Sequence, residues 1–169
     1  MAKPEQGSLE LLNDPAAQRL LASRLPAHLA YNWIDGTPRC TPIWFHWNGS
    51  EIVMAGPATA PRVQALTTGD PVAVTIDSSE WPYDVLLIRG TVNVDEVDGA
   101  APEYRAAAVR YFGDEQGNGW CDGLPDGMRM ARFRCAGRAA HRRDGPGWHR
   151  RVVPRRQDRS FAPCEVRAE

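Results

Sequence analysis

Short strand-like segments separated by tight turns dominate the first third of this sequence, and they restrict its fold more than any other feature. Large side chains alternate over residues 27–33, and further strands are expected at 39–47 and 51–55. Asp35-Gly36 and Asn48-Gly49 separate these strands, and such pairs favour tight hairpin turns. Three strands joined in this way predict an antiparallel meander.

The rest of the chain adds more strands and a few helices. In order, these are a helix from the N-cap residue Asp14 to Pro26, a short helix at 61–68, strands at 71–76 and 83–95, a helix at 102–112 that ends at Gly113, a glycine-rich loop at 113–127 and a strand at 128–134. Gly90 is expected to mark a bulge or bend in its strand. About six strands with peripheral helices predict a mainly β protein built as a small antiparallel barrel.

Charge divides the 169-residue chain, whose length suits one domain, into two unequal parts. Residues 1–134 hold 11 basic and 17 acidic side chains, whereas residues 135–169 hold 9 arginines and 4 acids. This break predicts a packed domain over 1–134 and an atypical arginine-rich tail over 135–169 that is a candidate for disorder. Trp148 and Phe161 lie among the tail's arginines, so nucleic-acid binding is a further hypothesis; a solvated tail is the favoured interpretation.

Composition gives no sign of a membrane span, a disulfide scaffold or a metal site. The longest aliphatic stretch, residues 85–88, is far shorter than a membrane helix, and the first residues lack the pattern of a signal peptide. The four cysteines have no metal-ligand spacing. We therefore expect a soluble cytoplasmic protein with reduced thiols and no metal.

The most suggestive local feature is the junction after the third expected strand. Residues 55–62 are mostly small, Thr59 offers a hydroxyl, and Pro61 opens a helix whose N-terminus attracts anions. Arg62 adds a guanidinium in the first turn, so the junction is a candidate site for a phosphate or carboxylate. A plain turn with a solvated arginine is the alternative.

Aromatic side chains are crowded between residues 31 and 83. Both faces of the 39–47 strand carry bulky groups, which suits a strand buried between a core and a partner or planar ligand; rings that only fill a barrel are the alternative. Pro42 cannot donate to a ladder, which indicates an edge or a bulge. Trp81-Pro82-Tyr83 is interpreted as a lid, an interface loop or a simple turn.

Conventional catalytic motifs do not occur in the sequence. The four histidines form no pair at metal-ligand spacing, and His46 is expected to be a packed or interface histidine. No nucleophile elbow or phosphate-binding glycine loop is present. If the chain is an enzyme, the difficult chemistry therefore belongs to a bound cofactor.

Five segments carry a family resemblance through their order and spacing. They are DGTPRCTPIWFHWNG (35–49), EIVMAGPATAPRVQAL (51–66), DPVAVTID (70–77), VLLIRGTV (85–92) and EYRAAAVRYFG (103–113). Together they resemble the pyridoxamine 5′-phosphate oxidase-like family over about residues 12–134. The resemblance implies a split antiparallel β-barrel and a homodimer that holds two flavin mononucleotide (FMN) molecules at its interface. Some relatives use a deazaflavin or haem instead, and some have no known catalytic role.

The resemblance also implies a cofactor site. Arg62, with Thr59 and the neighbouring backbone, would hold the flavin phosphate, and Arg39 is a second candidate for the phosphate or ribityl end. The backbone of residues 42–45 would line the isoalloxazine ring, and Trp81 and Tyr83 would reach across from the second subunit. The implied cofactor-binding positions are Arg39, Pro42, Ile43, Trp44, Phe45, Thr59, Pro61, Arg62 and Trp81.

Two departures from the family pattern limit what the resemblance implies. Residues from Cys135 onward lack strand alternation where members often have a last strand, and no segment matches the substrate-binding arginine–histidine segment of true pyridoxamine phosphate oxidases. The implied function is therefore that of an FMN-dependent oxidoreductase that transfers hydride to or from an unidentified small molecule. A non-catalytic flavin, deazaflavin or haem binding protein is the alternative.

Overall fold

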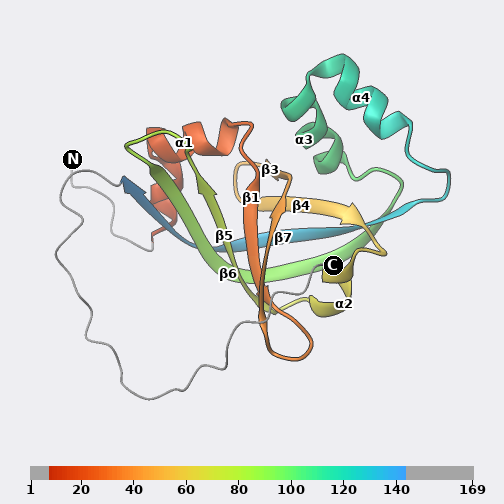
Figure 1. Ribbon diagram of the computed structural model, residues 1–169, viewed down its shortest axis with the longest axis horizontal. Coiled ribbons are helices and arrows are strands. Elements are labelled where there is room, and N and C mark those ends of the chain that lie inside the picture. Colours follow the sequence, from red (N-terminus) through yellow and green to blue (C-terminus); the bar gives the residue numbers. More distant parts are fainter. Residues whose placement is uncertain (1–7, 144–169) are drawn as a thin grey trace.

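Seven antiparallel strands form the body of the protein in a computed structural model that describes residues 8–143 (Figure 1). The strands are β1 (Ala27–Asn32), β2 (Pro38–Ile43), β3 (Phe45–Trp47), β4 (Ile52–Pro57), β5 (Pro71–Asp77), β6 (Asp84–Asp98) and β7 (Arg129–Arg143). They make one sheet in the order β2-β1-β5-β6-β7-β4-β3, which curls into a half-barrel. The prediction of a mainly β, split antiparallel barrel is confirmed, with seven strands in place of about six.

The extra strand arises because the expected strand at 39–47 is interrupted at Trp44. Ile43 ends β2 at one edge of the sheet, and Phe45 begins β3 at the other edge. A single residue spans only about 3.3–3.6 Å of extended chain. The two edges of the sheet must therefore approach each other at Trp44, and this requirement curls the sheet.

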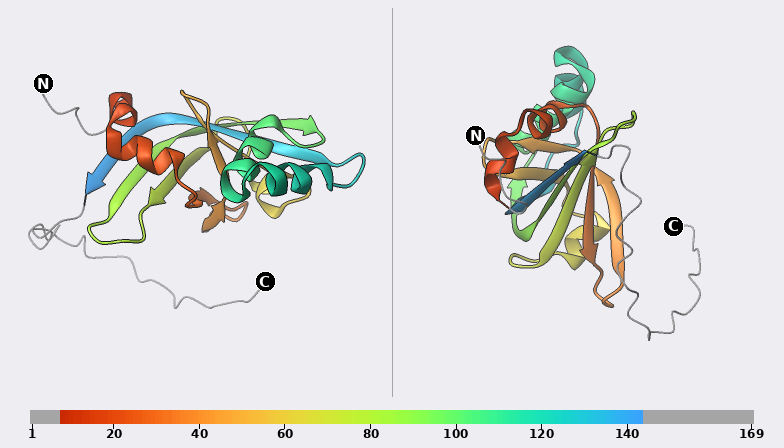
Figure 2. Two further views of the ribbon diagram at one scale, coloured as in Figure 1. Left: turned by 90° about the horizontal axis from the view of Figure 1, so that it is seen from above. Right: turned by 90° about the vertical axis from the view of Figure 1, so that its left-hand side faces the viewer.

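Four α-helices and one 3-10 helix flank the sheet (Figures 1 and 2). The 3-10 helix spans Leu9–Asn13, and the α-helices are α1 (Pro15–Ala22), α2 (Pro61–Ala65), α3 (Pro102–Phe112) and α4 (Asp114–Asp122). Asp14 caps α1 as predicted, since its carboxylate accepts a hydrogen bond from the amide of Ala16 at 2.8 Å. The paired helices α3 and α4 lie at one end of the molecule, beyond β3 and β4.

The hydrophobic core lies inside the curl of the sheet. Alternate residues of β1, including Leu29, point inward, and so do alternate residues of β5, including Val74. Phe45 and Phe133 are fully buried at the centre, and α1 covers one end of the core with Leu20 and Leu21. Period-two alternation thus places one face of β1 and one face of β5 in the core.

The last strand is longer than its sequence indicates. Its expected end at Arg134 is wrong, because β7 continues to Arg143 and pairs with β6 along its whole length. The prediction that strand structure is absent from Cys135 onward is therefore wrong for residues 135–143. The rest of the expected arginine-rich tail, with Trp148 and Phe161, lies outside the described residues.

Gly90 is not a bulge, because the pairing of β6 and β7 passes through it without interruption. It lies opposite Gly137, where an added Cβ would overlap the carbonyl oxygen of Arg89. The two backbones therefore approach each other too closely for any side chain at residue 137.

Charge fixes the register of β6 and β7 near α3. Arg132 on β7 lies opposite Asp95 on β6, with Nη2 2.6 Å from Oδ2. The same guanidinium reaches Glu103 in the first turn of α3 at 3.2 Å. One arginine therefore joins both long strands to the start of the helix pair.

The cysteines that the structure describes are free thiols. Cys40 is an exposed free thiol, and Cys121 and Cys135 are buried free thiols. Burial raises the pKa of Cys135 to about 11.

No helix among residues 8–143 has both the length and the apolar character that a membrane span requires.

The expected glycine-rich loop at 113–127 is wrong for residues 114–122, which form α4. The helix α4 packs closely on α3 at Gly117. A Cβ added to Gly117 would lie 2.5 Å from the backbone of Val109 in α3. Gly119, in the same helix, has nothing within 4 Å of such a Cβ. Gly117 is therefore required for the close approach of α3 and α4, whereas Gly119 is not.

We predict opposite effects for two matched substitutions in α4. Gly117→Ala should lower the free energy of unfolding by about 1–3 kcal/mol, because the new methyl group overpacks the contact with α3. Gly119→Ala should raise it by up to about 1 kcal/mol, because alanine restricts the unfolded backbone and favours a helix. Urea denaturation measures both, and equal effects would contradict the packing of α4 on α3.

Candidate functional site

Two cavities share the side chain of Arg62 in their linings. Cavity A, of about 390 Å³, is lined by Pro26, Pro42, Ile43, Trp44, Ala55, Gly56, Pro57, Arg62, Tyr104 and Trp120. Cavity B, of about 450 Å³, is lined by Tyr31, Trp33, Arg39, Thr41, Pro61, Arg62 and Gln64. Volumes of this size suit small molecules and cofactors.

Arg62 is a half-buried cation, and no acidic side chain in the described part of the chain pairs with it. It stands in the first turn of α2, and its Nε is buried without a hydrogen-bond partner. No carboxylate among residues 8–143 forms an ion pair with it. Burial lowers the pKa of Arg62 from its usual value, since desolvation disfavours the charged form. A guanidinium held in this way is ready to bind an anion.

Gly56 on β4 makes room for this guanidinium. An added Cβ at Gly56 would overlap Nη2 of Arg62, so the side chain lies directly against the backbone of the strand. The ring of Phe133 lies 6.0 Å from the guanidinium carbon. Backbone and ring together fix the position of the charge between the two cavities.

Cavity B is the more polar of the two. Alternation along β2 places Arg39 and Thr41 on one face, and both line the cavity. The hydroxyl of Thr41 is buried without a hydrogen-bond partner. The guanidinium of Arg39 lies 5.4 Å from the centre of the Trp33 ring. With Arg62, this cavity offers a second cation and a hydroxyl to an anionic group.

Cavity A is mostly apolar and aromatic. The link between β2 and β3 forms one side of it, the end of β4 forms another, and Tyr104 and Trp120 extend from the helix pair. The ring of Trp44 contacts four other rings at centroid distances between 5.1 and 6.2 Å, those of Tyr104, Tyr111, Phe112 and Trp120. Its shape and lining suit a planar ring system.

Arg110 fixes α3 against the link between β2 and β3. Its guanidinium donates hydrogen bonds to the carbonyl oxygens of Leu21, at 2.9 Å, and of Phe45, and it lies 4.2 Å from the centre of the Phe45 ring. Tyr111 donates a hydrogen bond to the carbonyl oxygen of Leu25 at 2.8 Å.

His46 is a partly buried histidine beside Arg110. Desolvation lowers the pKa of His46, and the positive charge of Arg110 lowers it further, which favours a neutral packed histidine.

Most of the predicted cofactor-binding residues lie together. Cavity A contains Pro42, Ile43, Trp44 and Arg62, and cavity B contains Arg39, Pro61 and Arg62. Their binding roles stay predictions.

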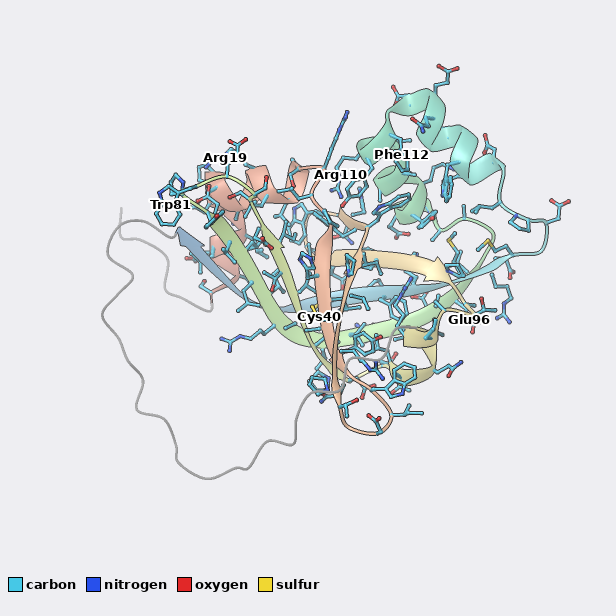
Figure 3. The ribbon with its side chains drawn as sticks, viewed as in Figure 1. Arg19, Cys40, Trp81, Glu96, Arg110 and Phe112 are labelled. Carbon is cyan, nitrogen blue, oxygen red and sulfur yellow. The ribbon has the colours of Figure 1, made fainter. Side chains whose placement is uncertain are left out.

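Three predicted positions line neither cavity. Phe45 is buried in the core, and Thr59 is exposed. Trp81 is 60% exposed and lies near α1, at the opposite end of the molecule from Phe112 and the helix pair (Figure 3). Its role across a subunit interface stays a prediction.

Sequence reasoning did not assign Tyr104, Trp120 or Thr41 to the site, and it included Gly56 only as one of the small residues of the 55–62 junction. The helical spacing of Tyr104 and Tyr111 was a usable signal for an aromatic face on α3. Trp120 was missed because its helix was taken for a loop. Nothing local marks Gly56 as the residue that receives the guanidinium.

Comparison with known proteins establishes the fold. No protein-family model matches the sequence, and no curated protein matches it. The chain is similar to a solved structure described as an F420 reductase, with 24% identity, coverage of 73% of this chain and 94% of that one, and a TM-score of 0.56. It has the split-barrel fold of pyridoxine phosphate oxidase-like proteins.

Two further solved structures are similar. One is an FAD and haem binding protein from Mycobacterium smegmatis, with 22% identity, coverage of 85% and 74%, and a TM-score of 0.53. The other is a protein of the pyridoxine phosphate oxidase family from Clostridium acetobutylicum, related to general stress protein 26, with 14% identity, coverage of 79% and 89%, and a TM-score of 0.52. At these identities the similarity shows the fold alone.

We predict that Gly56→Ala weakens binding of a phosphate-bearing ligand by displacing Arg62, although residue 56 also lines cavity A. The new methyl group displaces the Arg62 guanidinium, which can move because it is the end of a flexible side chain. Losing part of a charge-assisted contact should raise the Kd for FMN roughly fivefold or more. Flavin fluorescence measures this Kd, and Gly119→Ala is the matched control; an unchanged Kd for Gly56→Ala would separate Arg62 from the binding site.

Proposed function

We propose that this protein binds a flavin-type cofactor, FMN in the first instance, and acts as an oxidoreductase on a small molecule. The observation that carries the proposal is the half-buried Arg62 guanidinium, unpaired within the described chain, between a polar and an aromatic cavity. Support also comes from the fold, because similar structures are described as an F420 reductase and as an FAD and haem binding protein.

The residues present fit a phosphate joined to a planar ring. Arg62, Arg39 and the unpartnered hydroxyl of Thr41 would hold the phosphate end. The link between β2 and β3 would line the ring. Because β2 is an edge strand, one side of its backbone has no partner in the sheet and is available to the polar edge of a ring.

A flavin is the first cofactor hypothesis, and haem is a later one. No histidine lines either cavity, so a histidine ligand to haem iron is missing there, and Tyr31 and Tyr104 are the candidate ligands that the linings offer. A deazaflavin shares the phosphate and tricyclic ring of FMN, so it remains the second cofactor hypothesis.

The bound cofactor would supply hydride transfer. The chain itself would hold the phosphate through Arg62, present the edge of β2 to the ring, and exclude water with the apolar surfaces of Ile43, Trp44 and Tyr104. Neither cavity is lined by Asp, Glu, His, Cys or Lys. The protein's contribution is therefore positioning and desolvation, with no obligatory acid or base among these residues.

We also propose a cytoplasmic homodimer with the cofactor at its interface. The exposed rings of Trp81 and Tyr83, which contact each other edge-on at 5.5 Å, are proposed to reach the cofactor from the second subunit. Size-exclusion chromatography with and without FMN tests the dimer.

Removing the charge of Arg62 tests the cofactor site. Arg62→Ala should raise the Kd for FMN about ten- to a hundredfold, because a charge-assisted contact contributes roughly 1.5–3 kcal/mol. Arg19→Ala, which removes a charge on α1 near the opposite end of the molecule, is the matched control and should leave the Kd unchanged (Figure 3). Equal affinities for Arg62→Ala and the unmodified protein would refute the assignment.

The absence of Asp, Glu, His, Cys and Lys from both linings makes a non-catalytic flavin carrier the second candidate function. Absorbance at about 450 nm distinguishes the two, since flavin reduction bleaches this band. For an oxidoreductase we expect bleaching by a nicotinamide cofactor or a reduced deazaflavin, and recovery when an electron acceptor is added. A bound flavin that none of these donors reduces would favour the carrier.

A further inference from the structure

We infer that Trp120 and Tyr104 form the substrate side of cavity A, and that this side takes an uncharged, planar aromatic molecule with a hydrogen-bond acceptor oxygen. The inference rests on the proposed function in one respect: the cofactor is taken to occupy the Arg62 side of the cavity. The two sides come from different elements, since Trp120 and Tyr104 belong to the helix pair and Arg62 to α2.

The aromatic side is fixed before any ligand arrives. The indole nitrogen of Trp120 donates a hydrogen bond to the Tyr104 hydroxyl oxygen at 3.1 Å. The Trp44 ring contacts Tyr104 at 5.6 Å and meets Trp120 edge-on at 6.2 Å. A ring that stacks on this surface therefore finds it already ordered, which lowers the entropy cost of binding.

Trp120 retains an unused surface, because it is 52% exposed although it lines the cavity. Aromatic rings gain free energy from offset or edge contacts with other rings beyond their buried area. A planar aromatic ligand is therefore the molecule that this surface recognises best.

Tyr104 supplies the polar specificity. An indole N–H only donates, so the Tyr104 oxygen must accept from Trp120, and its own hydrogen is left to donate. No acceptor for that hydrogen occurs among residues 8–143. A ligand oxygen in the cavity would complete the pair.

The few charged side chains around cavity A favour a neutral ligand. Arg62 is the one charged side chain in the lining of cavity A, and a cofactor phosphate would neutralise it. The nearest acid in sequence to Tyr104, Glu103, is held by Arg132 at 3.2 Å. A charged ligand would thus lose its hydration without gaining a partner, which is costly.

A set of three matched probes tests the inference by calorimetry on the full chain loaded with FMN. The probes are 2-acetonaphthone, which is neutral, 2-naphthoate and 2-naphthylmethylammonium. We expect the neutral probe to bind most tightly, and Trp120→Ala to raise its Kd about tenfold. Leu9→Ala is the matched control, because Leu9 is an apolar side chain about as exposed as Trp120, at 57% against 52%, but lines neither cavity.

A second variant isolates the hydroxyl group. Tyr104→Phe should lose the preference for 2-acetonaphthone over 2-methylnaphthalene, whereas the unmodified protein should keep it. Circular dichroism on both variants checks that α3 and α4 remain folded. An unchanged preference in Tyr104→Phe overturns the hydrogen-bond assignment.

Other outcomes separate the inference from the proposed function. If Trp120→Ala binds 2-acetonaphthone as the unmodified protein does, or if it loses FMN to the same extent as the probe, the substrate-side assignment is wrong. If the unmodified protein retains no FMN, the proposed function fails, and the same titration on the cofactor-free chain still decides the inference through its dependence on Trp120.

Discussion

The single residue between the two edges of the sheet determines much of this structure. Because Trp44 alone separates β2 from β3, the sheet must curl until its edges approach each other. The same link forms one side of cavity A, and its indole ring is the centre of the aromatic cluster on α3 and α4. Closure of the sheet, the cavity and the attachment of the helix pair therefore share one position.

The arginines differ in how their charges are balanced. This difference distinguishes arginines that stabilise the fold from Arg62, which is a candidate for binding a ligand. Arg132 is paired with two carboxylates, and Arg105 with Asp122 at 2.8 Å. Arg110 lies against two carbonyl oxygens and two aromatic rings. Each of these guanidinium groups has an acid or a carbonyl oxygen as partner within the fold, although the Nε of Arg110, like that of Arg62, is buried without a hydrogen-bond partner. Arg62 is desolvated, and no acid among residues 8–143 pairs with it. An anion bound beside Arg62 would offset that cost.

Short sequence patterns correctly predicted the turns and helix ends, which depend on neighbouring residues in the chain. Asn48-Gly49 and Asp35-Gly36 do form turns, with Gly49 and Gly36 at positive φ, and Gly113 does end α3. The missed features depend on distant partners. The interruption at Trp44 follows from closure of the sheet, and the extension of β7 follows from its pairing with β6. The composition of α4 suggested a loop because the packing requirement at Gly117 is visible only beside α3.

The candidate site divides in the same way. Arg62 was identifiable because a small-residue turn before a helix is a local pattern with its own electrostatics. Gly56 and Thr41 were not, since their relation to Arg62 exists only after β2 and β4 curl to the same opening. A single sequence thus indicates that the Arg62 charge follows a small-residue turn. It does not indicate which residues from other strands surround that charge in the folded chain.

Arg62 and Trp120 stand on opposite sides of cavity A and are held by different contacts. Arg110 and Arg132 hold α3 through contacts outside the cavity lining, and neither contacts Trp120. Trp120 stands on α4, which is connected to the sheet mainly through α3 and the residues before β7. A substitution at Trp120 can therefore change the aromatic side while Arg62 and Gly56, which lie against each other, stay in place.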